Sequence, residues 1–289
     1  MPSRNLAELL RAAITRLKQA GIVDAEISAR ALLGFLLNKN PASLQLIINE
    51  PVIGGLETLY AELIEKRAAR CPLQYLIGSV EFYNVRLAVD SRALIPRPET
   101  ELLVDTAVRI IGNRSGRVLD MGTGSGCIAI AIARNAPAVR VVAVDISSEA
   151  LALAERNAAA NGVGERIEFI QADCLQISSW AAGGEYTMVV SNPPYVTESE
   201  YLNIEPEIRL YEPRQALVVP DIDPLIFYKA VIDGCSAMAA PPENILFEMP
   251  GCRAGALIEA VTDRNPLYKI EIIRDYSGAE RILILRIDN

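Results

Sequence analysis

The sequence predicts a small all-α N-terminal domain followed by an α/β domain, whose seven-stranded sheet is mostly parallel with an antiparallel last strand. Three observations predict this architecture. Apolar residues recur at helical spacing over residues 1–75. From residue 117 onward, short apolar runs alternate with helical patterns, which is typical of parallel strands joined by helical crossovers. The last two runs, 268–274 and 281–287, are joined by only about six residues, too few for a parallel connection.

The N-terminal domain, residues 1–75, has the pattern of a helical bundle. Its first helix should end at Gly21 and Asp24 could cap the second, because glycine favours helix ends and aspartate favours helix starts. Pro41 separates a short third helix from the second, and a longer fourth ends near Pro72. Such a bundle can be purely structural or can dock a macromolecular substrate. If the chain is an enzyme, we favour docking.

Residues 76–92 are predicted to form a β-hairpin linker, because apolar and polar residues alternate in their second half. Beyond them, Pro96 and Pro98 flank Arg97, and Glu99 favours the N-terminus of the next helix. On these grounds alone, Arg97 and Glu99 need be no more than a surface loop and a helix cap.

The α/β domain is predicted over residues 93–289. Parallel strands are buried on both faces and are continuously apolar rather than alternating. Helices fill the intervals, and Ser147 or Ser148 could cap the helix after the second strand. The seven predicted strands are residues 117–120, 139–144, 167–172, 186–190, 244–249, 268–274 and 281–287.

Composition excludes several classes of chemistry. The chain has 289 residues and no histidine, which removes every mechanism that needs a histidine base or a histidine metal ligand. Its five cysteines form no C-x-x-C pair, so neither a metal site nor a disulfide framework is predicted.

The net charge of −8 argues against direct nucleic-acid binding, which needs a basic face. No apolar run reaches the roughly 20 residues that span a bilayer, and the N-terminus lacks a signal-peptide pattern. We therefore expect a cytoplasmic protein with no membrane partner.

A glycine-rich loop, Gly122–Gly126, follows the first strand. Glycine lets the backbone pass close under a ligand, where a Cβ atom would clash. Asp145 ends the second strand, where a carboxylate can accept hydrogen bonds from a ribose diol. Loop and acid together predict a nucleoside-bearing cofactor, although the G-x-G-x-G spacing differs from the dinucleotide pattern. Asp173 and Cys174 end the third strand and could border an adenine, or could form only a strand-end turn with a helix cap.

The fourth strand runs into Asn192, which is followed by Pro193, Pro194 and Tyr195. Proline lacks an N–H and keeps the preceding residue out of the helical region, so the Asn192 amide is held at the carboxyl end of a central strand. Ligands of open α/β sheets bind beyond these strand ends. Tyr195 adds a flat aromatic face. Taken alone, the motif is equally compatible with a plain proline turn.

In combination, these motifs resemble known enzymes. Asp120-x-Gly122-Thr123-Gly124-Ser125-Gly126, Asp145 and Asn192-Pro193-Pro194-Tyr195 resemble the S-adenosylmethionine-dependent methyltransferases that modify planar nitrogens on a seven-stranded Rossmann-like sheet. The stretches Pro72–Gly78, Glu81-Phe82 and Leu94–Glu101 narrow the resemblance to the HemK/PrmC family, over nearly the whole chain. Members of that family methylate the side-chain amide nitrogen (N5) of the glutamine in the Gly-Gly-Gln motif of peptide chain release factors.

The resemblance implies S-adenosyl-L-methionine as cofactor, a peptide chain release factor as protein substrate, and no metal. It implies catalytic roles for Asn192 and Tyr195, and substrate contacts from these two residues and from Pro193 and Pro194. The Asn192 side-chain oxygen and the Pro193 carbonyl could accept the two N–H hydrogens of a glutamine amide and stabilise the charge that develops on its nitrogen. The implied cofactor-binding residues are Gly122, Thr123, Gly124, Ser125, Gly126, Asp145, Cys174 and Asn192.

Two stretches depart from the family's pattern. The family usually has Glu-x-Gly-x-x-Gln after the fifth strand, where this chain has Glu248-Met249-Pro250-Gly251-Cys252-Arg253. Some members carry an aromatic residue where Cys174 stands, which predicts a weaker cofactor contact. Arg97 and Glu99 are implied to lie near the substrate entrance. The segment after Tyr195 could be a lid, a substrate-facing loop or a solvated acidic face; its acidic residues include Glu205, Glu207 and Glu212.

Three alternatives stay open from the sequence. The same site could methylate a glutamine of a ribosomal protein or the amino group of a nucleic-acid base, although a nucleic-acid enzyme should show a basic cleft. The chain could also be a cofactor-binding module without activity, but the intact glycine loop, Asp145 and Asn192 argue against this.

Overall fold

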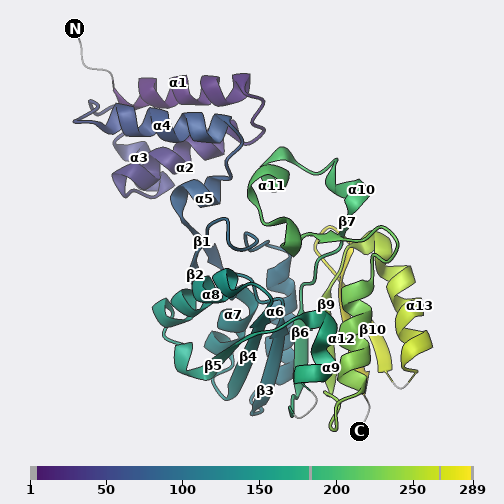
Figure 1. Cartoon of the computed structure of the whole chain (residues 1–289). Coiled ribbons are helices and arrows are strands. Elements are labelled where there is room, and N and C mark those ends of the chain that lie inside the picture. The colour runs from purple at the N-terminus through teal and green to yellow at the C-terminus, as the bar shows by residue number, and fades with distance from the viewer. Residues whose placement is uncertain (1–4, 182–183, 267, 288–289) are drawn as a thin grey trace. The chain divides into compact units, whose positions relative to one another are not determined.

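The computed structural model describes residues 5–181, 184–266 and 268–287. The first four residues, on which part of the targeting expectation depends, lie outside that range. The chain divides into two compact units (Figure 1), which are Met1–Ser79 with Glu205–Tyr211 and Val80–Ile204 with Glu212–Asn289. Among the helices described, none is both long and apolar enough to cross a membrane.

The first unit is a helical bundle with its own apolar core. Its first helix begins with a capping box, in which the Asn5 side chain accepts the Glu8 N–H and the Glu8 side chain accepts the Asn5 N–H. Tyr60 is fully buried, and its hydroxyl donates to the Ala29 carbonyl at 2.8 Å. The helices are α1 (Leu6–Gln19), α2 (Ala25–Leu37), α3 (Pro41–Leu46), α4 (Leu56–Ala68), α5 (Leu73–Ile77) and, from later in the chain, α11 (Pro206–Tyr211).

Asp24 precedes α2, but the expected side-chain cap is absent there. Its carboxylate instead accepts hydrogen bonds from the Ser28 hydroxyl and from Arg67 Nη2, both at 2.8 Å. Arg67 is 6% exposed, and a buried guanidinium must be paired with an anion. The prediction of a cap is therefore wrong, because the tertiary charge pair takes the carboxylate that would have capped the helix.

Arg67 also holds α11 within the first unit. Glu207 Oε1 lies 3.2 Å from Arg67 Nη1 and 3.2 Å from Arg70 Nη1. The Tyr211 hydroxyl donates to the Ala69 carbonyl at 2.9 Å. Glu205 is exposed, as a solvated acidic face requires, whereas Glu207 is not.

The second unit contains the predicted seven-stranded sheet, in the order β10-β11-β9-β6-β3-β4-β5. The neighbours from β9 to β5 are parallel, and β11 is antiparallel to both β9 and β10. The predicted fold class is confirmed, although the insertion of β11 between β9 and β10 was not predicted. The strands are β3 (Gly116–Met121), β4 (Val139–Asp145), β5 (Ile167–Gln171), β6 (Met188–Ser191), β9 (Asn244–Glu248), β10 (Tyr268–Arg274) and β11 (Glu280–Ile287).

Two small sheets accompany the large one. A hairpin forms where alternation predicted it, from β1 (Ser79–Phe82) and β2 (Val85–Ala88). Its turn residues Tyr83 and Asn84 both have positive φ, which matches the twist of two-residue hairpins. The other sheet pairs β7 (Val196–Thr197) with β8 (Val218–Val219), and α10 (Glu198–Tyr201) follows β7.

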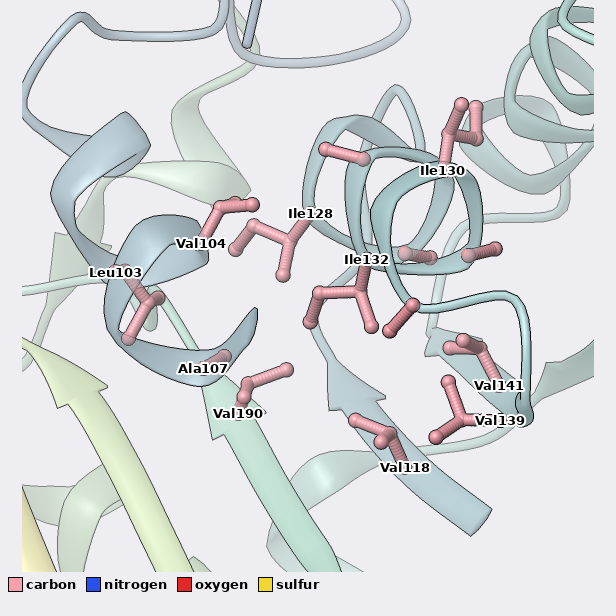
Figure 2. Close-up of a cluster of buried hydrophobic side chains, with 14 of the residues drawn as sticks. Leu103, Val104, Ala107, Val118, Ile128, Ile130, Ile132, Val139, Val141 and Val190 are labelled. Atoms are coloured by element: carbon pink, nitrogen blue, oxygen red, sulfur yellow. The ribbon is translucent and has the colours of Figure 1, made fainter. Parts of the chain in front are cut away.

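Helices cover both faces of the large sheet (Figure 1). Figure 2 shows the core on the first face, where Ile128 and Ile132 of α7 lie between Val104 of α6 and Val118 of β3. Ser147 caps α8 by accepting the Ala150 N–H. On the first face lie α6 (Thr100–Ile111), α7 (Cys127–Asn135) and α8 (Ser148–Ala160); on the second lie α9 (Ile177–Trp180), α12 (Ile226–Ser236) and α13 (Ala254–Arg264).

The strand order reverses between β3 and β6, because the chain runs from β3 through β4 to β5 and then crosses back to β6. Met121 and Ser191, the last residues of β3 and β6, are register partners, and the Ser191 hydroxyl donates to the Met121 carbonyl at 2.8 Å. The glycine-rich loop and Asn192 therefore leave the sheet side by side. This is the position at which open α/β sheets bind ligands.

Candidate active site

A cavity of about 340 Å³ opens beyond the carboxyl ends of the strands. It brings together most of the predicted site residues, from four different strand ends. Those in its wall are Gly122, Gly124, Asp145, Asp173, Cys174, Asn192, Pro193 and Pro194. Residues that were not predicted to belong to the site complete it, among them Leu94, Met121, Phe227 and Val231.

The glycine loop turns tightly under the cavity. Gly122 and Gly124 have φ of +76° and +54°, a region that glycine adopts without strain. The N–H groups of Gly122 and Thr123 both donate to the Val144 carbonyl at 2.9 Å, which ties the loop to the end of β4. A Cβ atom on Gly122 would meet no other atom within 4 Å. The open space above Gly122 is therefore room for a ligand rather than for a neighbouring side chain.

Asp145 is fixed at the end of β4 by two backbone donors. Its Oδ2 accepts the Gly124 N–H at 2.8 Å, and its Oδ1 accepts the Ser147 N–H at 2.9 Å. The residue is half-buried in the cavity wall, and each carboxylate oxygen retains a further lone pair. A diol placed in the cavity could donate to this carboxylate without displacing either N–H.

The end of β5 forms a helix cap and also lies in the cavity wall. Asp173 lines the cavity, and its side chain also caps the short helical turn Cys174–Gln176 by accepting the Leu175 N–H. Burial raises the pKa of the Cys174 thiol to about 12, so Cys174 lines the cavity as a neutral, weakly polar group.

Four predicted residues are not in the cavity wall: Thr123, Ser125, Gly126 and Tyr195. The Thr123 hydroxyl donates to Asp120, and Ser125 is buried. A Cβ on Gly126 would lie 2.9 Å from Ile130 and 3.0 Å from Ala154, so this glycine lets α7 pack on α8. Tyr195 is half-buried against the apolar core of the α12 face. Thr123 and Gly126 thus have structural contacts in this structure, and the predicted cofactor contacts of Thr123, Ser125 and Gly126 stay a prediction.

Asp120 is a fully buried carboxyl group below the loop. Its Oδ2 accepts the Thr123 hydroxyl at 2.7 Å and the Ala129 N–H at 3.1 Å. Its Oδ1 has no hydrogen-bond partner within the described part of the chain. Burial raises its pKa to about 7, because two donors do not offset the loss of water.

Asn192 presents its side-chain oxygen without an internal partner. Its Nδ2 donates to the Thr100 hydroxyl oxygen at 3.2 Å, while no donor among residues 5–181, 184–266 and 268–287 reaches its Oδ1. The Pro193 carbonyl likewise accepts no hydrogen bond from those residues. Asn192 and Pro193 are consecutive residues of the cavity wall, and each therefore has an acceptor oxygen that no described residue occupies.

The contact from Asn192 continues to a second buried carboxyl group. Thr100, the first residue of α6, donates its hydroxyl to Glu248 Oε2 at 2.6 Å. Thr100 and Glu248 are each 2% exposed. Neither residue was predicted to belong to the site, because no short-range pattern links two positions that are 148 residues apart.

Glu212 is buried, which excludes the solvated-face interpretation for this residue. Its Oε1 accepts Arg97 Nη2 at 2.6 Å, and its Oε2 accepts the Ile95 N–H at 3.0 Å. Arg97 and Glu212 thus hold the stretch before α6 against the segment after α11. Neither Arg97 nor Glu99 lines the cavity.

The loop that departs from the family's pattern has contacts of its own. Met249 is fully buried, and the following turn, Gly251–Arg253, leads into α13. Arg253 donates to the Tyr195 carbonyl through Nη1 and to Glu200 Oε2 through Nη2, the latter at 2.6 Å. This arginine therefore braces the chain that follows Pro194.

The residues of the cavity fit S-adenosyl-L-methionine. The open space over Gly122, the Asp145 carboxylate and the apolar wall beside Cys174 suit a small cationic nucleoside with a ribose and an adenine. Gly122, Gly124, Asp145 and Cys174 are the residues that would hold it.

Comparison with known proteins agrees with this geometry. The family model described as PrmC N-terminal domain matches residues 8–78, and the model described as Methyltransferase small domain matches residues 98–208. Among solved structures, the hMettl16 catalytic domain in complex with MAT2A 3′UTR hairpin 6 superposes with a TM-score of 0.58 at 16% identity, covering 79% of this chain and 83% of that one. That likeness shows the fold.

The sheet, the glycine loop and these models define an S-adenosylmethionine-dependent methyltransferase. A release factor glutamine methyltransferase from Chlorobaculum tepidum is 36% identical to this chain and covers 96% of it, with 95% of the relative matched. Another from Cereibacter sphaeroides is 35% identical, covering 97% of this chain and 98% of the relative. The chain belongs to the release factor glutamine methyltransferase family.

Proposed function

We propose that this protein methylates the N5 amide nitrogen of the glutamine in the Gly-Gly-Gln motif of a peptide chain release factor, with S-adenosyl-L-methionine as the methyl donor. The observation that carries the proposal is the pair of unpartnered acceptors, Asn192 Oδ1 and the Pro193 carbonyl, in the same cavity as the glycine loop and Asp145. A primary amide has two N–H hydrogens on one planar nitrogen, and two adjacent acceptors match it.

The chain's part in this reaction is to hold and polarise the amide. An amide nitrogen is a poor nucleophile because its lone pair is delocalised into the carbonyl. Acceptors at Asn192 and Pro193 fix the direction of that nitrogen and stabilise positive charge as it develops there. When bound, S-adenosyl-L-methionine supplies an electrophilic methyl group. The alkylated nitrogen is strongly acidic and gives its proton to water, so the mechanism requires no histidine base.

The proposed roles of the remaining residues follow from their places. Gly122 and Gly124 make room for the cofactor, Asp145 accepts hydrogen bonds from its ribose, and Cys174 borders its adenine. We propose Tyr195 as a wall of the substrate site, since it directly follows the cavity residue Pro194. A release factor substrate would also place the reaction in the cytoplasm, where translation terminates.

The function is tested with the full chain and isotope-labelled S-adenosyl-L-methionine, offered in parallel to release factor, ribosomal protein and DNA. We expect label on the release factor only, and none when its Gly-Gly-Gln glutamine is replaced by alanine. Label on ribosomal protein or DNA without label on the release factor would refute the proposal.

The site assignment is tested by Asn192→Ala. Methyl transfer should collapse, while cofactor binding survives in part because the glycine loop and Asp145 are intact. Asn135→Ala is the matched control, because Asn135 is an exposed asparagine at the end of α7, outside the cavity wall. Near-normal turnover of Asn192→Ala would overturn the assignment.

A further inference from the structure

We propose that Thr100 and Glu248 are positioning residues, which fix the direction of the Asn192 amide through a hydrogen-bond relay from Asn192 to Thr100 to Glu248. The inference rests on the proposed function, because it concerns how Asn192 presents its oxygen to a substrate amide. It extends that function by two residues that lie outside the cavity wall.

Three separate elements meet in this relay. Asn192 follows β6, Glu248 ends β9, and Thr100 begins α6, which packs against β9. Because β6 and β9 are parallel neighbours with Ser191 opposite Phe247, Asn192 and Glu248 stand at matching positions of adjacent strands. Thr100 bridges them, at 3.2 Å from Asn192 Nδ2 and 2.6 Å from Glu248 Oε2. Water is excluded from the bond between Thr100 and Glu248, since both residues are buried.

When Glu248 is ionised, the hydrogen bonds of the relay can run in one direction only, from Asn192 to Thr100 and from Thr100 to Glu248. A carboxylate can only accept hydrogen bonds, and a threonine hydroxyl has a single hydrogen to donate. Once Thr100 donates to Glu248, its oxygen can only accept from Asn192. Asn192 must therefore turn its NH₂ toward Thr100 and its Oδ1 away, to where a substrate amide needs an acceptor. Without the relay, the Asn192 amide can rotate by half a turn and oppose the substrate's N–H groups with its own.

The charge of Glu248 is set by several groups that face it. Arg281 from β11 and Arg97 from the stretch before α6 favour the carboxylate, whereas Glu99 disfavours it. The hydroxyls of Tyr195 and Tyr228 also lie near enough to interact with it. Burial dominates and raises the pKa of Glu248 to about 7. A protonated Glu248 could donate to Thr100, and the direction of the relay would then no longer be determined.

The first test compares Thr100→Val, Thr100→Ser and Thr106→Val at saturating cofactor and release factor. Thr100→Val should lower kcat by about 100-fold, the scale expected for a misplaced reacting group. Thr100→Ser keeps the hydroxyl and should restore kcat to within about 3-fold, and cofactor affinity should be unchanged in both. Thr106, which is equally buried on the same helix, is the control and should behave as wild type. Equal kcat for the valine and serine variants of Thr100 would overturn the relay.

The second test uses Glu248→Gln, because glutamine can donate as well as accept. Wild-type kcat should rise with pH through about 7, as Glu248 ionises. The Glu248→Gln variant should lose this inflection and stay low across the range. A Glu248→Gln variant with wild-type kcat would refute the role of the carboxylate.

A third readout needs no substrate, so it separates failure of the relay from failure of the proposed function. The side-chain amide signals of Asn192 in ¹⁵N-labelled protein can be identified by their loss in Asn192→Asp. They should shift in Thr100→Val and not in Thr106→Val. Unmoved signals in Thr100→Val refute the relay, whereas shifted signals with no labelling of release factor by the wild type refute only the proposed function.

Discussion

Gly122 and Gly126 both have a left-handed backbone, with φ of +76° and +82°. Their surroundings differ. Either Gly→Ala change should cost roughly 1 kcal/mol through backbone strain alone. Gly122→Ala would place its methyl in the cavity, so cofactor affinity should fall at least about 10-fold with little further loss of stability. Gly126→Ala would drive its methyl into Ile130 and Ala154, adding about 1–3 kcal/mol of destabilisation. Calorimetric titration and urea unfolding measure the two effects; equal losses in both assays would contradict this division.

Asp120 should make the stability of the folded chain pH-dependent. Its pKa is raised from 3.8 to about 7, mainly by burial, so between these pH values the folded protein holds a proton that the unfolded chain has released. The free energy of unfolding should therefore fall as pH rises through this window. In Asp120→Asn the free energy of unfolding should still fall with rising pH, but less steeply. Some of the fall remains because Glu248 has a similarly raised pKa. Urea unfolding at several pH values between 4 and 8 tests this, and identical slopes would argue against it.

The residues that could be predicted from sequence share a simple property. Gly122, Asp145 and Asn192 each follow or end a strand, and a strand end has a local signature. Glu248 also ends a strand, but its contact with Thr100 joins residues 148 positions apart and depends on how α6 packs against β9, so no local pattern predicted this contact. The structure also distinguishes Gly122 and Gly124, which line the cavity, from Gly126, which packs between helices. The motif alone could not make this distinction.

At the level of elements, the loop after β9 supports the loop after β6. Arg253 binds the Tyr195 carbonyl and Glu200, which lies in α10, and does not line the cavity. Arg253→Ala removes both contacts, and the opening free energy of residues 195–200 should fall by about 2 kcal/mol, the scale of charge-assisted hydrogen bonds. Cofactor affinity should be unchanged. Hydrogen exchange of peptides covering residues 195–200 measures the opening, and unaltered protection would show that the arginine is not a brace.

The same elements show what strand patterns can and cannot predict. Short stretches rich in apolar residues located all seven strands, and a connection of about six residues indicated that the last two are antiparallel. The two runs differ in a way that suits the observed order: β10 carries Lys269, Glu271 and Arg274 and is only partly buried at the edge, whereas Ile282–Leu285 of β11 is buried inside the sheet. That order depends on the whole sheet, where Met249 N–H donates to the Arg281 carbonyl and continues the pairing beyond β9.

At the scale of the whole molecule, the two units are not two consecutive stretches of chain. Glu205–Tyr211 leaves the second unit and belongs to the first, where Glu207 pairs with Arg67 and Arg70. The very next residue, Glu212, is buried within the second unit and holds Arg97. The sequence pattern could not show that Glu205–Tyr211 belongs to the first unit, since α11 is only a short helix in an acidic segment.

Two units with separate cores should unfold in two transitions, and each can be assigned by a different perturbation. S-adenosyl-L-methionine at about 100 times its Kd should stabilise the second unit by about 2.7 kcal/mol, because only that unit contains the cavity. Arg67→Met should destabilise the first unit by about 3 kcal/mol, since it removes the buried partner of Asp24 and leaves Glu207 paired with Arg70 alone. Differential scanning calorimetry should then show the ligand moving one transition and the substitution moving the other. If both perturbations move one common transition, the units unfold cooperatively, and the exchanged segment Glu205–Tyr211 couples their stabilities.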